Sequence, residues 1–282
     1  MNFCGKNNFM SATITAADIN KLRQTTGAGM LDCRKALTES NGDFEAAIDW
    51  LRKQGQKVAA KRSDREAKEG VILAKTTADN KTGIIVCISC ETDFVSKNAE
   101  FVTFTQSIMD AAIENNIKTA EELNEVSING TKVSELINDK LAAIGEKIAI
   151  KVERVDASFV ASYIHGANRM GVLVGFNKDA VAAGKDVAMQ IAAMNPLAID
   201  ETSIAPETIA REREIAIEQI KAEGKPAEMA EKIAIGKVNK FFKDNTLMAQ
   251  AFVKDNSKSV ADYLKSVDAD LKITEFKRVA LG

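Results

Sequence analysis

Hydrophobic residues near the start of the chain recur with helical spacing and are separated by clear start and stop signals. Thr15 followed by Asp18 is the pattern of a capping box. Gly27 is placed to end the first helix in a left-handed conformation. A second helix is predicted over 30–40, and Asp43 is placed to cap a third. The pattern therefore predicts a compact module of three short helices.

The middle of the chain alternates between strand and helix patterns. The run 83–90 is almost continuously apolar and β-branched, which is typical of a strand buried on both faces. A strand-rich segment followed by a helix occurs twice, at 71–115 and at 147–194, which indicates two related subdomains. Strands are predicted at 71–77, 83–91, 147–155, 158–164, 170–176 and 271–279, and helices at 96–115, 132–145, 179–194 and 257–266.

The segment 206–243 has the pattern of a helical hairpin. Its first helix is highly charged and ends at Gly224-Lys225-Pro226, where glycine can end one helix and proline can begin the next. The apolar positions form only a narrow stripe, so the hairpin is expected to protrude or to pack along a single seam. The stripe of the second helix consists of Ala230, Ala234, Val238 and Phe241.

These patterns predict an α+β protein with antiparallel sheets. We expect a disordered extension, a three-helix module, a charged segment that is either a solvated linker or an exposed helix, a core of two subdomains and a protruding hairpin. The expected boundaries are 1–11 for the extension, 12–57 for the module, 58–70 for the linker, 71–145 for the first core subdomain, 146–204 for the second, 205–243 for the hairpin and 244–282 for the return to the second subdomain.

Composition and charge narrow the function. Of the 282 residues, 45% are apolar. The 38 basic residues nearly balance the 40 acidic ones, so the net charge does not favour direct binding to nucleic acid. The sequence contains neither a run of 18 apolar residues nor a signal pattern, and its four cysteines lack framework spacing. We therefore expect a cytoplasmic protein that does not bind membranes.

Catalytic and metal chemistry find little support in the sequence. His165 is the only histidine, which excludes His-based metal triads, and the glycine-rich nucleotide and hydrolase motifs are absent. Cys87 and Cys90 have the spacing of a redox pair, but in a strand these positions point to opposite faces. Besides a protein that binds one dedicated partner, two other functions remain open at this point. The chain could be a helical adaptor or chaperone-like protein, or a thiol enzyme that uses these two cysteines.

The candidate contact residues lie in three places. Thr92-Asp93-Phe94-Val95 forms a polar turn between a buried strand and a helix expected to start near Ser96, so Asp93 and Phe94 are presented on a rigid base. The alternative is that Phe94 folds back into the core. The segment 26–31 is either an interhelical turn or a flexible contact with Met30 and Leu31 exposed. His165, in a predicted turn, is interpreted as a surface contact.

The chain resembles the bacterial elongation factor Ts family over essentially 14–279. The motifs at 22–37 and 91–95 are specific to that family. The residues that carry the resemblance are Leu22-Arg23-Gln24-Thr25-Thr26-Gly27-Ala28-Gly29-Met30-Leu31-Asp32-Cys33-Arg34-Lys35-Ala36-Leu37, Glu91-Thr92-Asp93-Phe94-Val95, Tyr163-Ile164-His165-Gly166-Ala167, Gly171-Val172-Leu173-Val174, Gly224-Lys225-Pro226 and Gln250-Ala251-Phe252-Val253.

The resemblance implies a translation elongation factor that binds elongation factor Tu·GDP and promotes GDP release without cofactor, metal or covalent chemistry of its own. It also implies a ubiquitin-associated-like module and a protruding antiparallel coiled coil. Many members continue past the last strand into a further helix that touches the GTPase, whereas this sequence ends at Gly282. The sequence leaves open a homodimer or a 2:2 complex with the partner.

The resemblance assigns the contacts residue by residue. Asp93 and Phe94 are expected to enter the GTPase domain near its magnesium and phosphate-loop region, with the aromatic ring as a wedge. The neighbouring Thr92 and Val95 belong to the same contact. The anchoring contacts are Arg23, Met30 and Leu31 on the GTPase domain and His165 on another domain of the partner.

Overall fold

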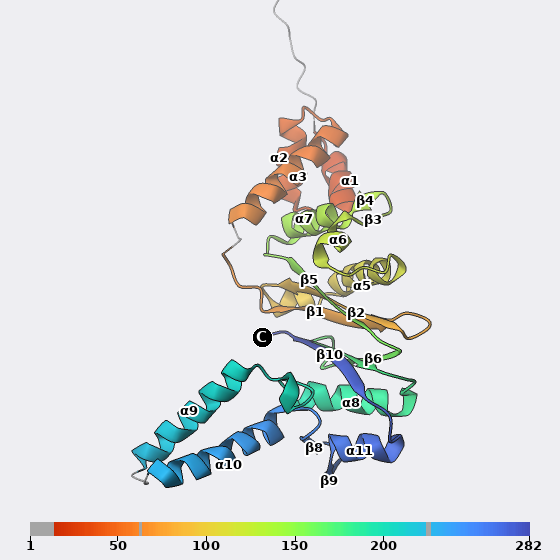
Figure 1. Ribbon diagram of the computed structural model, residues 1–282. Coiled ribbons are helices and arrows are strands. Elements are labelled where there is room, and N and C mark those ends of the chain that lie inside the picture. Colours follow the sequence, from red (N-terminus) through yellow and green to blue (C-terminus); the bar gives the residue numbers. More distant parts are fainter. Residues whose placement is uncertain (1–13, 62–63, 224–226) are drawn as a thin grey trace, which may run out of the picture.

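Three short helices form the first part of the computed structural model, which describes residues 14–61, 64–223 and 227–282 (Figure 1). Helices α1 (Ala16–Thr26), α2 (Met30–Glu39) and α3 (Phe44–Lys61) pack around a small core that includes Leu22 and Leu37. The capping box predicted at Thr15 and Asp18 is present, and Gly27 ends α1 with φ at 69°. The three predicted helices are confirmed. The predicted extension 1–11 lies outside the described residues.

Two antiparallel sheets of three strands form the centre of the molecule (Figure 1). Both are built in the same way: a hairpin is followed by helices, and a third strand then pairs with the second strand of the hairpin. The first sheet has the order β1 (Glu69–Thr76), β2 (Thr82–Cys90), β5 (Ala149–Asp156). The second sheet has the order β6 (Phe159–His165), β7 (Met170–Phe176), β10 (Ile273–Ala280).

The two sheets face each other, and helices cover their outer faces, which gives four layers (Figure 1). Alternate residues along β1 therefore enter different cores. Ile72 and Ala74 face the second sheet, whereas Val71 and Leu73 face the helices. This double burial explains the nearly continuous apolar runs. Helices α5 (Ala99–Glu114) and α6 (Ala120–Glu125) pack on the first sheet, and α8 (Val181–Met194) packs on the second. Helix α7 (Val133–Ile144) packs against α6, and α11 (Val260–Val267) packs against α8.

The close approach of the sheets depends on glycine. A Cβ atom added to Gly171 would lie 2.8 Å from the Cγ2 atom of Ile72 in the facing sheet. A Cβ atom added to Gly83 would lie 2.7 Å from side-chain atoms of both Val160 and Leu173. A side chain at either position would push the sheets apart.

The hairpin consists of α9 (Pro206–Ala222) and α10 (Ala227–Asn245), which extend away from the sheets (Figure 1). Its narrow seam buries Ala216, Ile220 and Ala234, with Ile217 and Ile233 partly buried beside them. Of the predicted stripe, Ala234 is buried, and Val238 and Phe241 are half-buried. The predicted turn at Gly224-Lys225-Pro226 and the side chain of Ala230 lie outside the described residues.

Several details differ from the sequence prediction. Strand β5 pairs with β2, so it belongs to the first sheet, although the boundary expected at 146 assigned it to the second subdomain. Helix α3 continues to Lys61, so the predicted linker begins as a helix. The sequence patterns missed several short elements: α6, the ladder of β3 (Ser127–Ile128) and β4 (Thr131–Lys132), the 3₁₀ helix η1 (Glu201–Ser203), and the ladder of β8 (Ala251–Phe252) and β9 (Asp255–Ser259).

Candidate functional site

Three of the four residues predicted to contact a partner near Phe94 lie on a separate helical turn, α4 (Asp93–Ser96), and the fourth, Thr92, is its N-cap. The prediction that the long helix starts near Ser96 was wrong. Asn98 is the N-cap of α5, and its Oδ1 atom accepts a hydrogen bond of 2.7 Å from the amide of Glu100. After β2 the chain therefore makes one helical turn, α4, and then begins a second helix, α5. The second helix can begin there because Asn98 accepts a hydrogen bond from an amide in its first turn that has no partner within the helix.

Phe94 is 86% exposed on this turn. Val95, the next residue, is half-buried and packs on the core between the first sheet and its helices. The interpretation that Phe94 folds back into the core was therefore wrong. An exposed phenylalanine next to a packed valine gives the turn one side that is held by the fold and one side that is open to another molecule.

Charges surround the same turn. The carboxylate of Asp93 lies 2.7 Å from Nζ of Lys97, and this contact lowers the pKa of Asp93. Arg169, from the turn between β6 and β7, forms an ion pair with Glu69 at 2.5 Å. Glu69, and after it Asp93, raises the pKa of Arg169. The turn between β6 and β7 and the α4 turn are therefore close enough to interact electrostatically.

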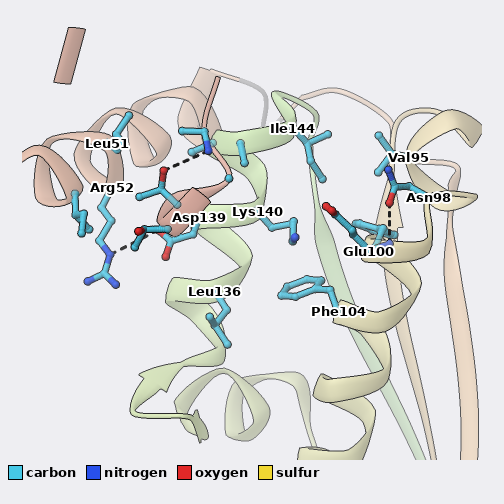
Figure 2. Close-up of a pocket in the computed structure, with 18 of the residues that line it drawn as sticks. Leu51, Arg52, Val95, Asn98, Glu100, Phe104, Leu136, Asp139, Lys140 and Ile144 are labelled. Atoms are coloured by element: carbon cyan, nitrogen blue, oxygen red, sulfur yellow. Dashed lines mark hydrogen bonds and ion pairs between the residues drawn. The ribbon is translucent and has the colours of Figure 1, made fainter. Parts of the chain in front are cut away.

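A cleft of about 610 Å³ separates the three-helix segment from the Phe94 turn (Figure 2). Its walls come from α3, α5 and α7, with Leu51 and Arg52 on one side and Phe104 on the other. Lys140 of α7 lies over the Phe104 ring, 5.1 Å from its centroid. The turn between α1 and α2 also lines the cleft, as do Phe94 and Val95. The cleft thus brings two of the three predicted contact regions together.

The predicted anchor residues of the three-helix segment are exposed. Met30 and Leu31 open α2 directly after the turn that lines the cleft, and they are 56% and 81% exposed. Arg23 is an exposed residue in the last turn of α1. Large apolar side chains in this position contribute nothing to the core of the segment, which favours a contact with another molecule.

His165 lies on the other sheet and does not line the cleft. It is the exposed last residue of β6, and the turn begins after it, at 166. Its Nδ1 atom is 3.0 Å from the hydroxyl oxygen of Tyr163. The turn is joined to the first sheet because the amide of Ile72 donates a 2.8 Å hydrogen bond to the carbonyl oxygen of Asn168. His165 and the Phe94 turn are therefore linked through β1.

The two cysteines of β2 are buried on opposite faces of the strand, as the spacing predicts. Cys87 lies between the two sheets, and Cys90 lies in the core beneath the helices. Burial raises the pKa of Cys87 to about 11 and that of Cys90 to about 12. Neutral, separated thiols are poor nucleophiles. Within residues 14–61, 64–223 and 227–282, no group of three or more His, Cys, Asp or Glu side chains is placed to hold a metal ion.

Comparison with known proteins identifies the family. A family model described as elongation factor TS matches residues 91–282, which begin one residue before Thr92 and include His165. The chain belongs to the elongation factor Ts family. Elongation factor Ts of Flavobacterium psychrophilum is 50% identical over 275 residues, which cover 96% of this chain and 100% of that relative. Elongation factor Ts of Christiangramia forsetii is 49% identical with the same coverage.

A more distant relative, elongation factor Ts of Clostridium perfringens, is 42% identical over 282 residues, with 95% of this chain and 93% of the relative covered. Members of the elongation factor Ts family are translation elongation factors. Across the described part of the chain, no helix is long and apolar enough to cross a membrane.

The sequence patterns missed two residues that shape the site. Glu146 follows the glycine that ends α7 and contacts Thr92 through its carboxylate, and Arg169 joins Glu69. Both are single charged residues in loops, and their pairing partners lie 54 and 100 positions away in the sequence. Without knowledge of the strand order, spacing alone could not identify either.

Proposed function

We propose that this chain is a cytoplasmic translation elongation factor that binds elongation factor Tu·GDP and promotes release of GDP. Phe94 would insert near the magnesium and phosphate-loop region of the GTPase domain, with Asp93, Thr92 and Val95 in the same contact. The observation that carries this proposal is the 86% exposed phenylalanine on a turn whose neighbour Val95 is packed into the core. A large apolar group held outward is suited to displace another side chain.

Linkage explains how such an insertion promotes exchange. A GTPase holds GDP through its phosphate loop and Mg²⁺. This chain would bind the GTPase best when those elements are displaced. It would then weaken the binding of the nucleotide to the GTPase by the same factor by which the nucleotide weakens the binding of this chain. The chain therefore needs no covalent chemistry of its own.

The wedge needs anchors for energetic reasons. Burial of one phenylalanine side chain is worth about 1.5–3 kcal/mol, which alone is too little for a shift of several powers of ten. Exposed Leu31 and Met30 offer additional apolar surface on the three-helix segment, and Arg23 adds an exposed cation in the last turn of α1. His165 would supply a separate contact from the second sheet. We assign the anchoring energy to these residues and the displacement to Phe94.

The test is release of fluorescent GDP from purified elongation factor Tu with catalytic amounts of this chain and of its Phe94→Ala form. We expect fast release with the intact chain, and we expect Phe94→Ala to slow release much more than it weakens the complex. Leu31→Ala and Arg23→Ala should instead mainly raise the dissociation constant. Failure of the intact chain to accelerate release would reject the proposed function, and equal losses of rate and affinity in Phe94→Ala would reject the division between wedge and anchors.

A further inference from the structure

Glu146 holds the start of the Phe94 turn through three hydrogen bonds. Its Oε2 atom accepts from the backbone amides of Glu91 at 3.0 Å and Thr92 at 2.9 Å, and its Oε1 atom accepts from the Thr92 hydroxyl at 2.6 Å. The carboxylate of Glu91 in turn accepts a 2.6 Å bond from the amide of Lys147. In each of these two adjacent segments, a glutamate carboxylate therefore accepts hydrogen bonds from backbone amides of the other segment.

The position of this contact explains its form. The regular pairing of β2 with β5 ends at Ser89 and Ala149, since the chain beyond Cys90 turns away into α4. The amides of Glu91 and Thr92 would lose their ladder partners at that point. The Glu146 carboxylate replaces those partners with charge-assisted hydrogen bonds, which are short and strongly directional.

Glu146 also connects the turn to the three-helix segment. It directly follows Gly145, which ends α7 in a left-handed conformation with φ at 76°. Farther back on α7, Asp139 lies 3.7 Å from the guanidinium of Arg52 in α3 (Figure 2). One helix therefore contacts the anchor-bearing segment through its side and the Phe94 turn through the residue after its end.

We propose that Glu146 is a positioning residue for nucleotide exchange, which fixes the direction of the Phe94 turn relative to α7 and to the three-helix segment docked on it. This inference rests on the proposed function, in which Phe94 is the displacing group. Without the carboxylate, α4 keeps its packing through Val95, but Glu91 and Thr92 lose the bonds that orient the chain entering the turn. Phe94 then samples more directions, and fewer of them fit the nucleotide pocket.

The first measurement concerns the free chain and needs no GTPase. Amide hydrogen exchange at Glu91 and Thr92 should be slow in the wild type and clearly faster in Glu146→Ala. Glu146→Gln should restore protection, because its carbonyl oxygen can accept both amides while its NH₂ group donates to the Thr92 hydroxyl oxygen. Unchanged protection in Glu146→Ala would overturn the inference, whatever the outcome for the proposed function.

The second measurement is the rate of GDP release at saturating concentrations of each variant, together with the dissociation constant. We expect Glu146→Ala to slow release by about tenfold or more with a change of less than about threefold in affinity, and Glu146→Gln to stay within about threefold of the wild-type rate. Glu125→Ala is the matched control. Glu125 is an exposed glutamate at the end of α6, outside the site, and its carboxylate lies 2.7 Å from Nζ of Lys132 in β4. A normal release rate in Glu146→Ala despite lost amide protection would overturn the positioning role.

A double variant tests whether Glu146 acts through Phe94. If it does, Glu146→Ala should slow release in the wild-type background but have little further effect on Phe94→Ala. Equal slowing in both backgrounds would mean that the carboxylate acts independently of the ring, which would overturn the inference. If the wild-type chain does not promote GDP release at all, the proposed function fails, while the amide measurement still tests whether Glu146 orders the turn.

Discussion

Gly55 of α3 packs directly against Ala142 of α7. A Cβ atom added to Gly55 would lie 2.8 Å from the Ala142 Cβ atom and 3.2 Å from the carbonyl oxygen of Asn138. Arg52, on the same helix, lies 3.7 Å from Asp139 and 3.9 Å from Glu135. The three-helix segment is therefore docked on the core by a close backbone contact and an ionic one, beside the cleft that it shares with the Phe94 turn.

We predict that Gly55→Ala displaces the three-helix segment without unfolding it. The new methyl group cannot fit at 2.8 Å from another Cβ atom, so α3 has to move away from α7. Alanine in place of glycine also favours the helix itself by up to about 1 kcal/mol, so the segment should remain folded. The dissociation constant for elongation factor Tu should rise, because the exposed Leu31 is displaced relative to Phe94.

Gly236→Ala in α10 is the control for this prediction. Outside its own helix, no atom of the described chain lies within 4 Å of a Cβ atom built at Gly236. This substitution should raise the free energy of unfolding by about 0.5–1 kcal/mol and leave partner binding unchanged. Titration calorimetry and urea unfolding measure the two quantities. The docking model would be contradicted if Gly55→Ala bound as tightly as the wild type.

Two phenylalanines on neighbouring helices should respond oppositely to truncation. Phe94 is 86% exposed, whereas Phe101 is 2% exposed and lies in the core of the first sheet. Phe94→Ala should change the free energy of unfolding by less than about 0.5 kcal/mol, because it removes few packing contacts. Phe101→Ala should lower it by about 3–5 kcal/mol through lost burial and a cavity. Urea unfolding of both variants tests this, and a large loss of stability in Phe94→Ala would mean that its ring packs on the fold in solution.

The sequence predicted the elements near the site better than their relations in space. Capping residues such as Thr15 and Asp43 act within a few residues, so the helix starts they define were correct. The α4 turn was missed because Asn98, rather than Ser96, caps α5, and both residue types are good caps. The pairing of β5 with β2 was missed because both sheets have similar apolar strands, and their pattern does not encode which strands are neighbours.

The same limit applied to the site. Phe94 could be singled out from its position between a buried strand and a helix, yet its exposure depends on the helical turn and on Val95 turning inward. Glu146 could not be found, since its role exists only after α7 ends beside the start of the turn. Side chains that make local contacts are predictable from the sequence, whereas those that join distant segments require the fold.

Tyr163 should position His165 for its contact. The Tyr163 hydroxyl oxygen lies 3.0 Å from Nδ1 of His165, and the rings are 5.9 Å apart with a tilt of 36°. This contact restricts the imidazole ring and leaves Nε2 as the nitrogen available to a partner. We predict that Tyr163→Phe raises the dissociation constant a few-fold, with thermal stability unchanged, because the hydrogen bond is exposed to solvent. Tyr163→Phe should have no further effect in a His165→Ala background, and a full additional loss there would contradict the positioning role.

The buried thiol of Cys87 should make the fold less stable at alkaline pH. Its pKa is raised by burial from 9.0 to about 11. Between these values the unfolded chain releases the thiol proton while the folded chain keeps it, so the free energy of unfolding falls as pH rises. This contribution to stability is present below pH 9 and is lost as pH rises through the folded pKa. In Cys87→Ala the decrease between about pH 8 and about pH 10 should be smaller by about 1 kcal/mol, even though the loss of the sulfur lowers stability at every pH. Urea unfolding at several pH values measures the slopes, and parallel curves for the two proteins would mean that this thiol titrates alike in the folded and unfolded chains.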